Sequence, residues 1–224
     1  MLEGIILYNE NEGSGGKAML MYEKNLWDQG CTLVAGIDEV GRGCLFGDVV
    51  AAAVIMPYGL VLEDVNDSKK LSEKKRELLF ELIMQEAVAV GIGIVDVDTI
   101  EAINIKQAAR LAMKQAVHKL EILPEYLLVD AEKIDIELPQ MSIIHGDAVS
   151  QSIAAASIIA KVTRDRMCIE WDELYPEYGI GVHKGYATKR HRDMLQRHGP
   201  TPLHRKLFIR NVMAGCEQME LELL

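Results

Sequence analysis

The chain has 224 residues, 49% of them hydrophobic, which suffices for one main domain with a sizeable core. No apolar run approaches the roughly 20 residues that cross a bilayer, and the N-terminal residues are not those of a secretion signal, so we expect a soluble, cytoplasmic protein with no membrane partner. The net charge of -10 argues, as a sum, against nucleic-acid binding, because polyanions are bound largely through Lys and Arg.

The distribution of charge changes that argument. Residues 183–210 contain eight Lys or Arg and one acid, a local charge of +7 in a chain that is otherwise strongly acidic. Such a segment is either a nucleic-acid contact or an ordinary solvated helix face, and the charge pattern alone leaves both open.

The cysteines and histidines do not predict a zinc site. The four cysteines are far apart and form no Cys-x-x-Cys pair, so we expect free thiols in a reducing compartment. The histidines of the basic segment have no partner cysteine, and we expect them to contact phosphate or to be exposed. They are His183, His191, His198 and His204.

The first half of the chain predicts strands joined by short turns. Residues 1–30 have the composition of an appendage, possibly flexible, and a strand follows over residues 32–38. After a glycine-rich turn, the apolar run 49–56 predicts a second strand, and Ser72 is placed to cap a helix. Residues 87–95 predict a third strand, and Thr99 is placed to cap one long helix reaching towards Pro124.

The second half alternates strands and helices. A buried strand is predicted over residues 126–130 and a short one near Ile143, after which Ser150 or Ser152 caps an Ala/Ile-rich helix. Thr188 is placed to open another helix, closed at Gly199. Three strands in hairpin-like succession followed by alternation predict an α/β fold with a mixed sheet flanked by helices.

Four carboxylates fall at or just after the ends of predicted strands: Asp38, Glu39, Asp130 and Asp147. Clustered acids raise one another's pKa and need a cation to neutralise them, and hard oxygen ligands favour Mg²⁺ or Mn²⁺. Two such ions suit phosphodiester hydrolysis or transfer. The alternative is that acids follow strands only because strand ends reach the surface.

The surrounding motifs decide between these readings. Residues 36–43 (GIDEVGRG) strongly resemble the signature of type 2 ribonuclease H, and five further blocks resemble that family in order. They begin DSKKL at residue 67, NI at 104, LVD at 128, GD at 146 with IAAASIIAKVTRD from 153, and HKGY at 183 with HR at 204. The resemblance extends to about Ile209.

The resemblance implies a fold, an activity and a ligand set. It implies a ribonuclease H-like mixed five-stranded sheet with a C-terminal helical extension. It also implies that Asp38, Glu39, Asp130 and Asp147 are catalytic and bind two Mn²⁺ or Mg²⁺ ions in the substrate complex. The implied activity is cleavage of RNA in RNA–DNA hybrids and 5' to single ribonucleotides in duplex DNA, giving 3'-hydroxyl and 5'-phosphate ends.

Substrate contacts are implied in the same way. Gly41, Arg42 and Gly43 match the loop that senses the ribonucleotide 2'-hydroxyl, and Tyr186 matches a residue that packs on the neighbouring sugar. Lys69, and with it Lys161, is implied as a phosphate or metal-cluster contact. The plain alternatives are a hairpin turn, a core tyrosine and surface lysines.

Some residues depart from the family pattern. The turn reads Cys44-Leu45-Phe46-Gly47-Asp48 where prolines and small residues are usual, and Ala131-Glu132 replaces a glycine and a polar residue. Arg42 and the short N-terminus favour type 2 over the related type 3 enzymes. The remaining alternative is a catalytically inactive nucleic-acid-binding module of the same fold.

The expected organisation is an N-terminal appendage over residues 1–30, a catalytic domain over 31–210 and a tail over 211–224. The family resemblance implies a monomer. Whether a replication clamp binds the acidic tail is left open by the sequence.

Overall fold

The computed structural model describes residues 5–7, 19–62, 65 and 71–221, with side chains placed from 19 to 214 within these ranges. Its centre is a five-stranded sheet in the order β5-β3-β2-β6-β7. The strands are β2 (Val34–Val40), β3 (Val49–Ile55), β5 (Ala89–Val95), β6 (Tyr126–Asp130) and β7 (Gln140–Ile143).

The sheet is mixed, as the order of predicted elements required. β2, β3 and β5 pair antiparallel, whereas β2, β6 and β7 pair parallel. β2 is therefore the strand where the two arrangements meet, with β3 on one side and β6 on the other. The end of β2 therefore lies between the β2–β3 connection, which contains Asp48, and the β6–β7 connection, which contains Glu132.

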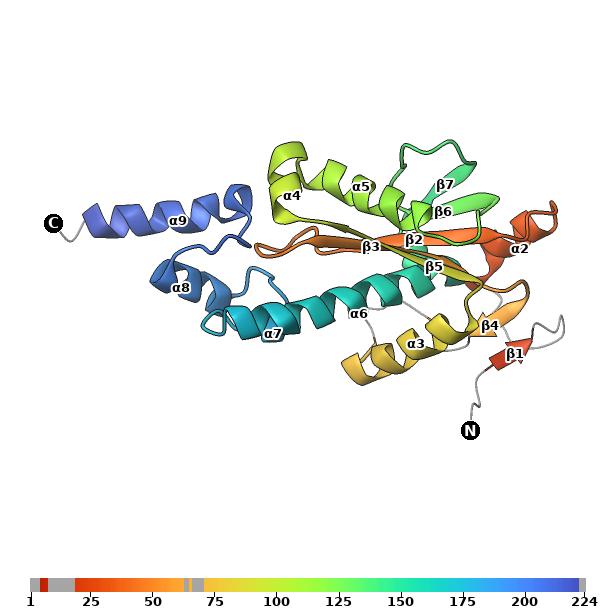
Figure 1. Cartoon of the computed structure of the whole chain (residues 1–224), viewed down its shortest axis with the longest axis horizontal. Coiled ribbons are helices and arrows are strands. Elements are labelled where there is room, and N and C mark those ends of the chain that lie inside the picture. Colours follow the sequence, from red (N-terminus) through yellow and green to blue (C-terminus); the bar gives the residue numbers. More distant parts are fainter. Residues whose placement is uncertain (1–4, 8–18, 63–64, 66–70, 222–224) are drawn as a thin grey trace.

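Helices cover both faces of the sheet (Figure 1). On one face, α4 (Val97–Ile103) and α5 (Ile105–His118) enclose a core of sheet residues and small α5 residues such as Ala112. On the other face, α3 (Glu73–Glu86) and α6 (Gln151–Leu174) enclose a second core. No helix in the described part of the chain is both long and apolar enough to cross a membrane.

Two glycines allow the helices to approach the sheet closely. A Cβ on Gly36 of β2 would lie 2.0 Å from the backbone carbon of Ser152, at the start of α6. A Cβ on Gly93 of β5 would lie 1.9 Å from the carbonyl oxygen of Ala112 in α5. Both contacts are shorter than any Cβ permits, so a larger residue at either position would push a helix off the sheet.

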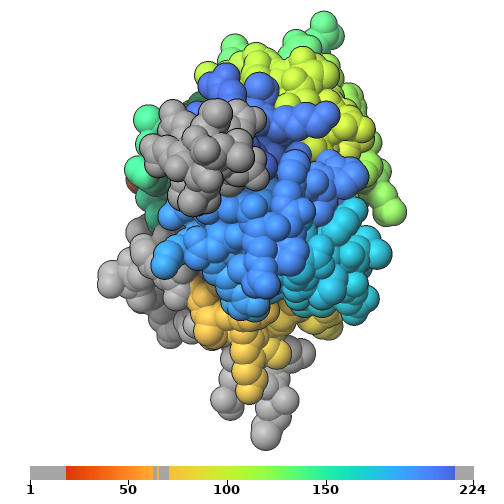
Figure 2. All heavy atoms as spheres, turned by 90° about the vertical axis from the view of Figure 1, so that its left-hand side faces the viewer, coloured from red at the N-terminus to blue at the C-terminus, as the bar shows by residue number. Residues whose placement is uncertain are grey.

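The C-terminal helices form a separate cluster at one end of the sheet. They are α7 (Ile180–His183), α8 (Lys189–His198) and α9 (Lys206–Leu221). Phe46, from the β2–β3 connection, is completely buried against Trp171, Tyr178 and Leu195. Figure 2 views this end, where the blue atoms of α8 and α9 fill the centre of the face.

The N-terminal segment contributes structure of its own. β1 (Ile5–Leu7) pairs antiparallel with β4 (Leu60–Leu62). The helix α2 (Met21–Trp27) lies between β1 and β2 in the sequence. The carboxylate of Glu23 in α2 is buried and accepts hydrogen bonds from the Ser150 hydroxyl at 2.6 Å and the Ser152 amide at 3.0 Å. The domain boundaries stay a prediction, but α2 is tied to the start of α6, and α9 crosses the expected boundary at 210/211.

The structure confirms the capping residues that the sequence predicted for three helices. The side chains of Ser72, Ser150 and Thr188 each accept a backbone hydrogen bond at the start of α3, α6 and α8. The prediction of one long helix capped by Thr99 is wrong. Asp96 caps α4, and the chain breaks at Asn104, whose φ of 65° and ψ of 160° are outside the helical region.

Ala131 provides a test of backbone strain after β6. Its φ is +49°, a left-handed conformation that costs residues with a Cβ about 1–2 kcal/mol. We expect Ala131→Gly to raise the free energy of unfolding by about 0.5–1 kcal/mol in urea denaturation. Ala102→Gly, at an exposed position inside α4, should lower it by a similar amount. A loss of stability in both variants would contradict the assignment of strain to Ala131.

Candidate active site

The carboxylates meet where β2 and β6 end. In the parallel pairing of these strands Ile37 lies opposite Val129, so Asp38 and Asp130 follow at neighbouring positions. Glu39 is the next residue of β2. We call Asp38, Glu39, Asp130 and Asp147 the carboxylate cluster.

Burial and mutual repulsion shift the first two carboxylates. Burial raises the pKa of Asp38 well above its ordinary value, and the neighbouring charges of Glu39 and Asp130 raise it further. Burial also raises the pKa of Glu39, although the adjacent Arg42 opposes the rise. The two groups therefore lie in a crowded negative site that favours either a proton or a cation.

Asp147 is positioned near the other carboxylates by a hydrogen bond of its neighbour Gly146. It lies in a single 3-10 turn, η2 (Gly146–Ala148), and is 5% exposed. The Gly146 amide donates a 2.7 Å hydrogen bond to Oδ1 of Asp130, which ties this turn to the end of β6. The fourth carboxylate is therefore adjacent in the chain to a residue bonded to the third.

The carboxylate cluster offers oxygen ligands of the kind that a divalent cation requires, but its side chains are not arranged around a common point. Among the described residues, no group of three or more His, Cys, Asp and Glu side chains stands ready to hold a metal ion. The Glu39 amide and Arg42 each donate to a nearby carboxylate, on Asp38 and Glu39 respectively. Oε2 of Glu39 is nevertheless buried without a hydrogen-bond partner, and a hard cation would satisfy it.

The glycine loop, residues 41–48, connects β2 to β3 beside this cluster. Gly41 has a φ of +98°, and a Cβ there would lie 2.4 Å from Nε of Arg164. Gly43 is exposed, with no atom within 4 Å of where its Cβ would be. The first glycine is thus required by the fold, whereas the second leaves the backbone open to a ligand.

Two fully buried arginines hold the glycine loop by its carbonyl oxygens. Arg164 of α6 donates to the carbonyls of Phe46 and Asp48, each at 2.9 Å, and to that of Lys184 at 2.8 Å. Arg205 donates to four carbonyls of the loop, and burial lowers its pKa to about 10. These acceptors are Gly41 at 2.7 Å, Gly47 at 2.8 Å, Cys44 at 3.0 Å and Arg42 at 3.3 Å.

Tyr186 lies against the same loop. Cys44 and Tyr186 form an isolated antiparallel bridge, and the Leu45 amide donates to the Gly185 carbonyl at 2.9 Å. The Tyr186 side chain is 42% exposed, so it is not a core tyrosine. The structure therefore brings together Tyr186 and the glycine loop, which sequence reasoning had linked only through family resemblance.

Arg42 is partly exposed, and its guanidinium pairs with two acids. Its Nη1 lies 3.0 Å from Oε1 of Glu39 and 3.4 Å from Oε1 of Glu132. Glu132 is buried, and it also accepts from Nε and Nη2 of Arg110 at 3.0 and 2.9 Å. Glu132, noted in the sequence only as a departure from the family, thus bridges two arginines.

The histidine expectation is wrong for two of the four residues. His191 and His204 are buried, with their Nε2 atoms 3.2 Å apart, and neither is available to phosphate. Burial lowers the pKa of His191 to about 4 and that of His204 to about 3, so both are neutral near pH 7. They pack beside Phe46 and support the glycine loop from within.

The basic residues also separate into two groups. Arg205, counted with the basic segment, is internal, whereas Lys189, Arg190 and Arg192 are exposed on α8. Lys161 is paired with Asp165 at 2.6 Å. Lys69 lies outside the described residues, so its role stays a prediction.

Little in the amino-acid pattern indicates this internal role for Arg205. Its segment is rich in cations and poor in acids, which resembles a surface, and carbonyl partners leave no mark in a sequence. The only available signal was the position of Arg205 immediately after His204 in a recognised block.

Comparison with known proteins agrees with this geometry. A family model described as Ribonuclease HII matches residues 35–211, from the start of β2 into α9. The chain belongs to the ribonuclease HII family. Ribonucleases H are metal-dependent nucleases, and the chain is an enzyme of that class.

Relatives cover nearly the whole domain. Ribonuclease HII of Alkaliphilus metalliredigens is 56% identical over 200 residues, which are 87% of this chain and 98% of the relative. The solved PCNA:RNase HII complex from Archaeoglobus fulgidus matches at 27% identity and a TM-score of 0.65, over 80% of this chain and 96% of that one. Bst-RNase HIII in complex with Mn²⁺ shares the fold, at 19% identity and a TM-score of 0.59, over 84% of this chain and 66% of that one. The expected ribonuclease H-like mixed sheet is confirmed.

The role of Arg205 can be measured through stability. We expect Arg205→Lys to lower the free energy of unfolding by about 2–4 kcal/mol, because one ammonium cannot reach four carbonyls and the remainder stay buried without donors. Arg197→Lys, exposed on α8, is the matched control and should change it by less than about 0.5 kcal/mol. Equal stability of both variants in urea denaturation would show that Arg205 does not hold the loop.

Proposed function

We propose that this chain is an endoribonuclease that hydrolyses the RNA strand of RNA–DNA hybrids and cuts 5' to single ribonucleotides in duplex DNA. The observation that carries the proposal is the junction of the glycine loop with the carboxylate cluster. Arg42 in the loop lies 3.0 Å from Glu39 in the cluster, so a recognised sugar would lie beside the reacting phosphate. Specificity and chemistry would then share one short segment of chain.

The carboxylate cluster is proposed to hold two Mg²⁺ or Mn²⁺ ions. Bound there, such ions supply an activated water and stabilise the leaving oxygen, which gives 3'-hydroxyl and 5'-phosphate ends. Asp38 and Glu39 come from a rigid central strand, and Asp130 is fixed by the Gly146 amide. The chain therefore contributes preorganised anionic oxygens whose repulsion falls when cations enter.

The glycine loop is proposed to recognise the ribose. Gly43 is open, so backbone groups can approach a sugar without a Cβ between them, and the 2'-hydroxyl is the group that separates RNA from DNA. Tyr186, held by its bridge to Cys44, offers an exposed ring for the neighbouring sugar. The carbonyl bonds of Arg164 and Arg205 fix the loop before substrate arrives, which limits the entropy lost on binding.

Arg42 is proposed to change partners during binding. In the absence of cations its guanidinium neutralises Glu39, and a cation at Glu39 would take over that role. Glu132 then keeps Arg42 near the site, because the two groups already lie 3.4 Å apart. The released donors of Arg42 would face the substrate backbone.

The metal assignment predicts the behaviour of one variant. Asp147→Asn should lower turnover on the order of 10²–10³-fold, since one ligand charge is lost, while the free energy of unfolding stays equal or rises. Asp28→Asn, at the exposed end of α2, is the matched control and should cut normally. Near-normal turnover by Asp147→Asn would show that the ligand assignment is wrong.

The decisive assay uses a DNA duplex with one embedded ribonucleotide, incubated with Mg²⁺ or Mn²⁺ and, separately, with chelator. The proposal expects a metal-dependent cut on the 5' side of that ribonucleotide. Cutting only within longer RNA stretches would remove the single-ribonucleotide specificity. Binding without cutting would support the inactive nucleic-acid-binding module instead.

A further inference from the structure

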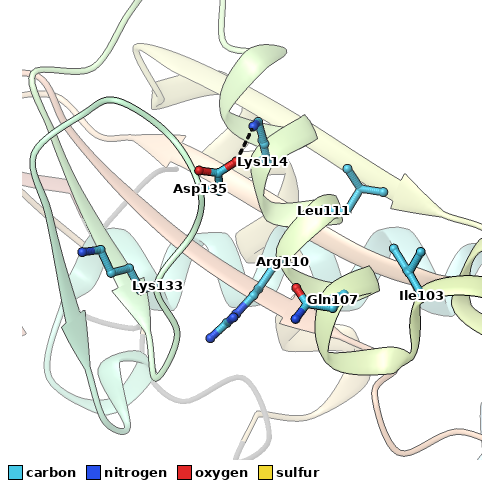
Figure 3. Close-up of a pocket in the computed structure, with 7 residues that line it drawn as sticks. All are labelled: Ile103, Gln107, Arg110, Leu111, Lys114, Lys133 and Asp135. Carbon is cyan, nitrogen blue, oxygen red and sulfur yellow. Dashed lines mark hydrogen bonds and ion pairs between the residues drawn. The ribbon is translucent and has the colours of Figure 1, made fainter.

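A pocket with a basic lining opens between α5 and the β6–β7 connection (Figure 3). Its volume is ≈ 430 Å³, and four of its lining residues are charged. We call these four, Arg110, Lys114, Lys133 and Asp135, the basic pocket. Figure 3 shows Arg110 and Lys114 on α5, Asp135 reaching Lys114 from the β6–β7 connection, and Lys133 on the same connection with its side chain directed away from α5.

Three of the four charges are positive, and they differ in availability. Lys133 is exposed and has no ion pair or hydrogen bond with any other described residue. Lys114 is 3.2 Å from Asp135, whose side chain is fully exposed, and such surface pairs contribute little. Lys133 is thus ready for an anion, and Lys114 can exchange its partner at small cost.

Arg110 gives the pocket a fixed wall. Its guanidinium makes two bonds, of 3.0 and 2.9 Å, to the buried carboxylate of Glu132. The other side of Glu132 contacts Arg42, which in turn contacts Glu39 of the carboxylate cluster. A continuous series of ion pairs therefore connects the basic pocket to the proposed site of cleavage.

We infer that the basic pocket binds a backbone phosphate of the duplex, a few nucleotides from the phosphate that is cut. This inference rests on the proposed function, since it needs a polyanion whose scissile group lies at the carboxylate cluster. A duplex strand carries phosphates at regular short spacing, so a strand lying on the cluster presents further phosphates to surfaces beside it. Lys133 and Lys114 are the donors that it would meet.

The charge of the protein makes such a contact useful. The chain carries a net charge of -10, and its carboxylate cluster repels phosphate until cations bind. Helix α8, which carries exposed cations, lies at the lower left of Figure 1, whereas the β6–β7 connection lies well away from it, above the right half of the sheet. A duplex held at both places would be gripped on two sides of the cluster, which fixes its direction across the site.

The experiment measures binding of an RNA–DNA hybrid by fluorescence anisotropy across a series of salt concentrations, in Mg²⁺. Asp147→Asn serves as the background so that the duplex stays intact, and Lys133→Ala and Asp135→Asn are added to it. Lys119→Ala, an exposed cation just beyond the end of α5, is the matched control. Wild-type cleavage is measured alongside.

Loss of one phosphate contact lowers the slope of log K against log salt by about 0.9. We therefore expect Lys133→Ala to bind 3- to 10-fold more weakly at low salt with a slope reduced by about that amount, roughly as for a phosphate-contacting lysine. Asp135→Asn should bind more tightly, roughly 2- to 5-fold, because it releases Lys114. Lys119→Ala should match its background in both affinity and slope.

The failure of each idea has its own outcome. If the wild type cuts the hybrid but Lys133→Ala keeps the slope of the Lys119→Ala control, the basic pocket does not contact the duplex. Inorganic phosphate or a mononucleotide, each at millimolar concentration, is added as a competitor of the hybrid. If neither weakens hybrid binding and Lys133→Ala still reduces the salt slope, the basic pocket binds the strand and not a free phosphate. If the wild type neither binds nor cuts the hybrid, the proposed function is wrong.

Discussion

The glycine loop depends on two fully buried guanidinium groups. Arg164 and Arg205 direct most of their donors at backbone carbonyls, which are numerous in a tight loop and hard to satisfy from within it. A loop that must leave one glycine open to a ligand cannot fold over itself to supply these bonds. Donors from α6 and from the C-terminal segment supply them instead, and the loop keeps its shape in the absence of substrate.

The carboxylate cluster and the glycine loop impose opposite demands on the same few residues. Burial and repulsion raise the pKa values of Asp38 and Glu39, which disfavours the folded state when both are charged. Arg42 reduces that repulsion from one end of the loop, and Glu132 holds Arg42. The crowding of acids in the carboxylate cluster is thus compensated by an arginine of the glycine loop, so the proposed catalytic and recognition elements are linked electrostatically as well as in space.

Sequence reasoning predicted the parts of the fold that depend on local pattern. The strand at residues 126–130, the caps at Ser72 and Thr188, and the position of acids near strand ends all follow from short-range periodicity and capping chemistry. The break at Asn104 could not be seen, because no glycine or proline marks it. The Asn104 side chain stabilises the strained backbone by accepting hydrogen bonds from the amides of Lys106 and Gln107.

Residues whose partners are distant in the chain are hard to predict for a related reason. The charged and polar neighbours of Arg205 and His204 predict a surface segment. Arg205 instead donates to carbonyls of the glycine loop, more than a hundred residues earlier, and His204 packs on Phe46 of that loop. Main-chain acceptors have no sequence signature. In the sequence Glu132 is only a departure from the family pattern. Its role as a bridge between Arg42 and Arg110 follows from the positions of the two arginines in the structure.

The separation between Gly41 and Arg205 has a consequence for the life of the protein. A growing polypeptide cannot close the glycine loop until residue 205 has left the ribosome, although β2 and β3 emerge much earlier. The central sheet can therefore assemble during translation while the nuclease site stays incomplete. Fragments released early by premature termination would carry the acids and the residues of the glycine loop without the Arg205 that holds the loop in shape, so we expect them to lack an ordered site.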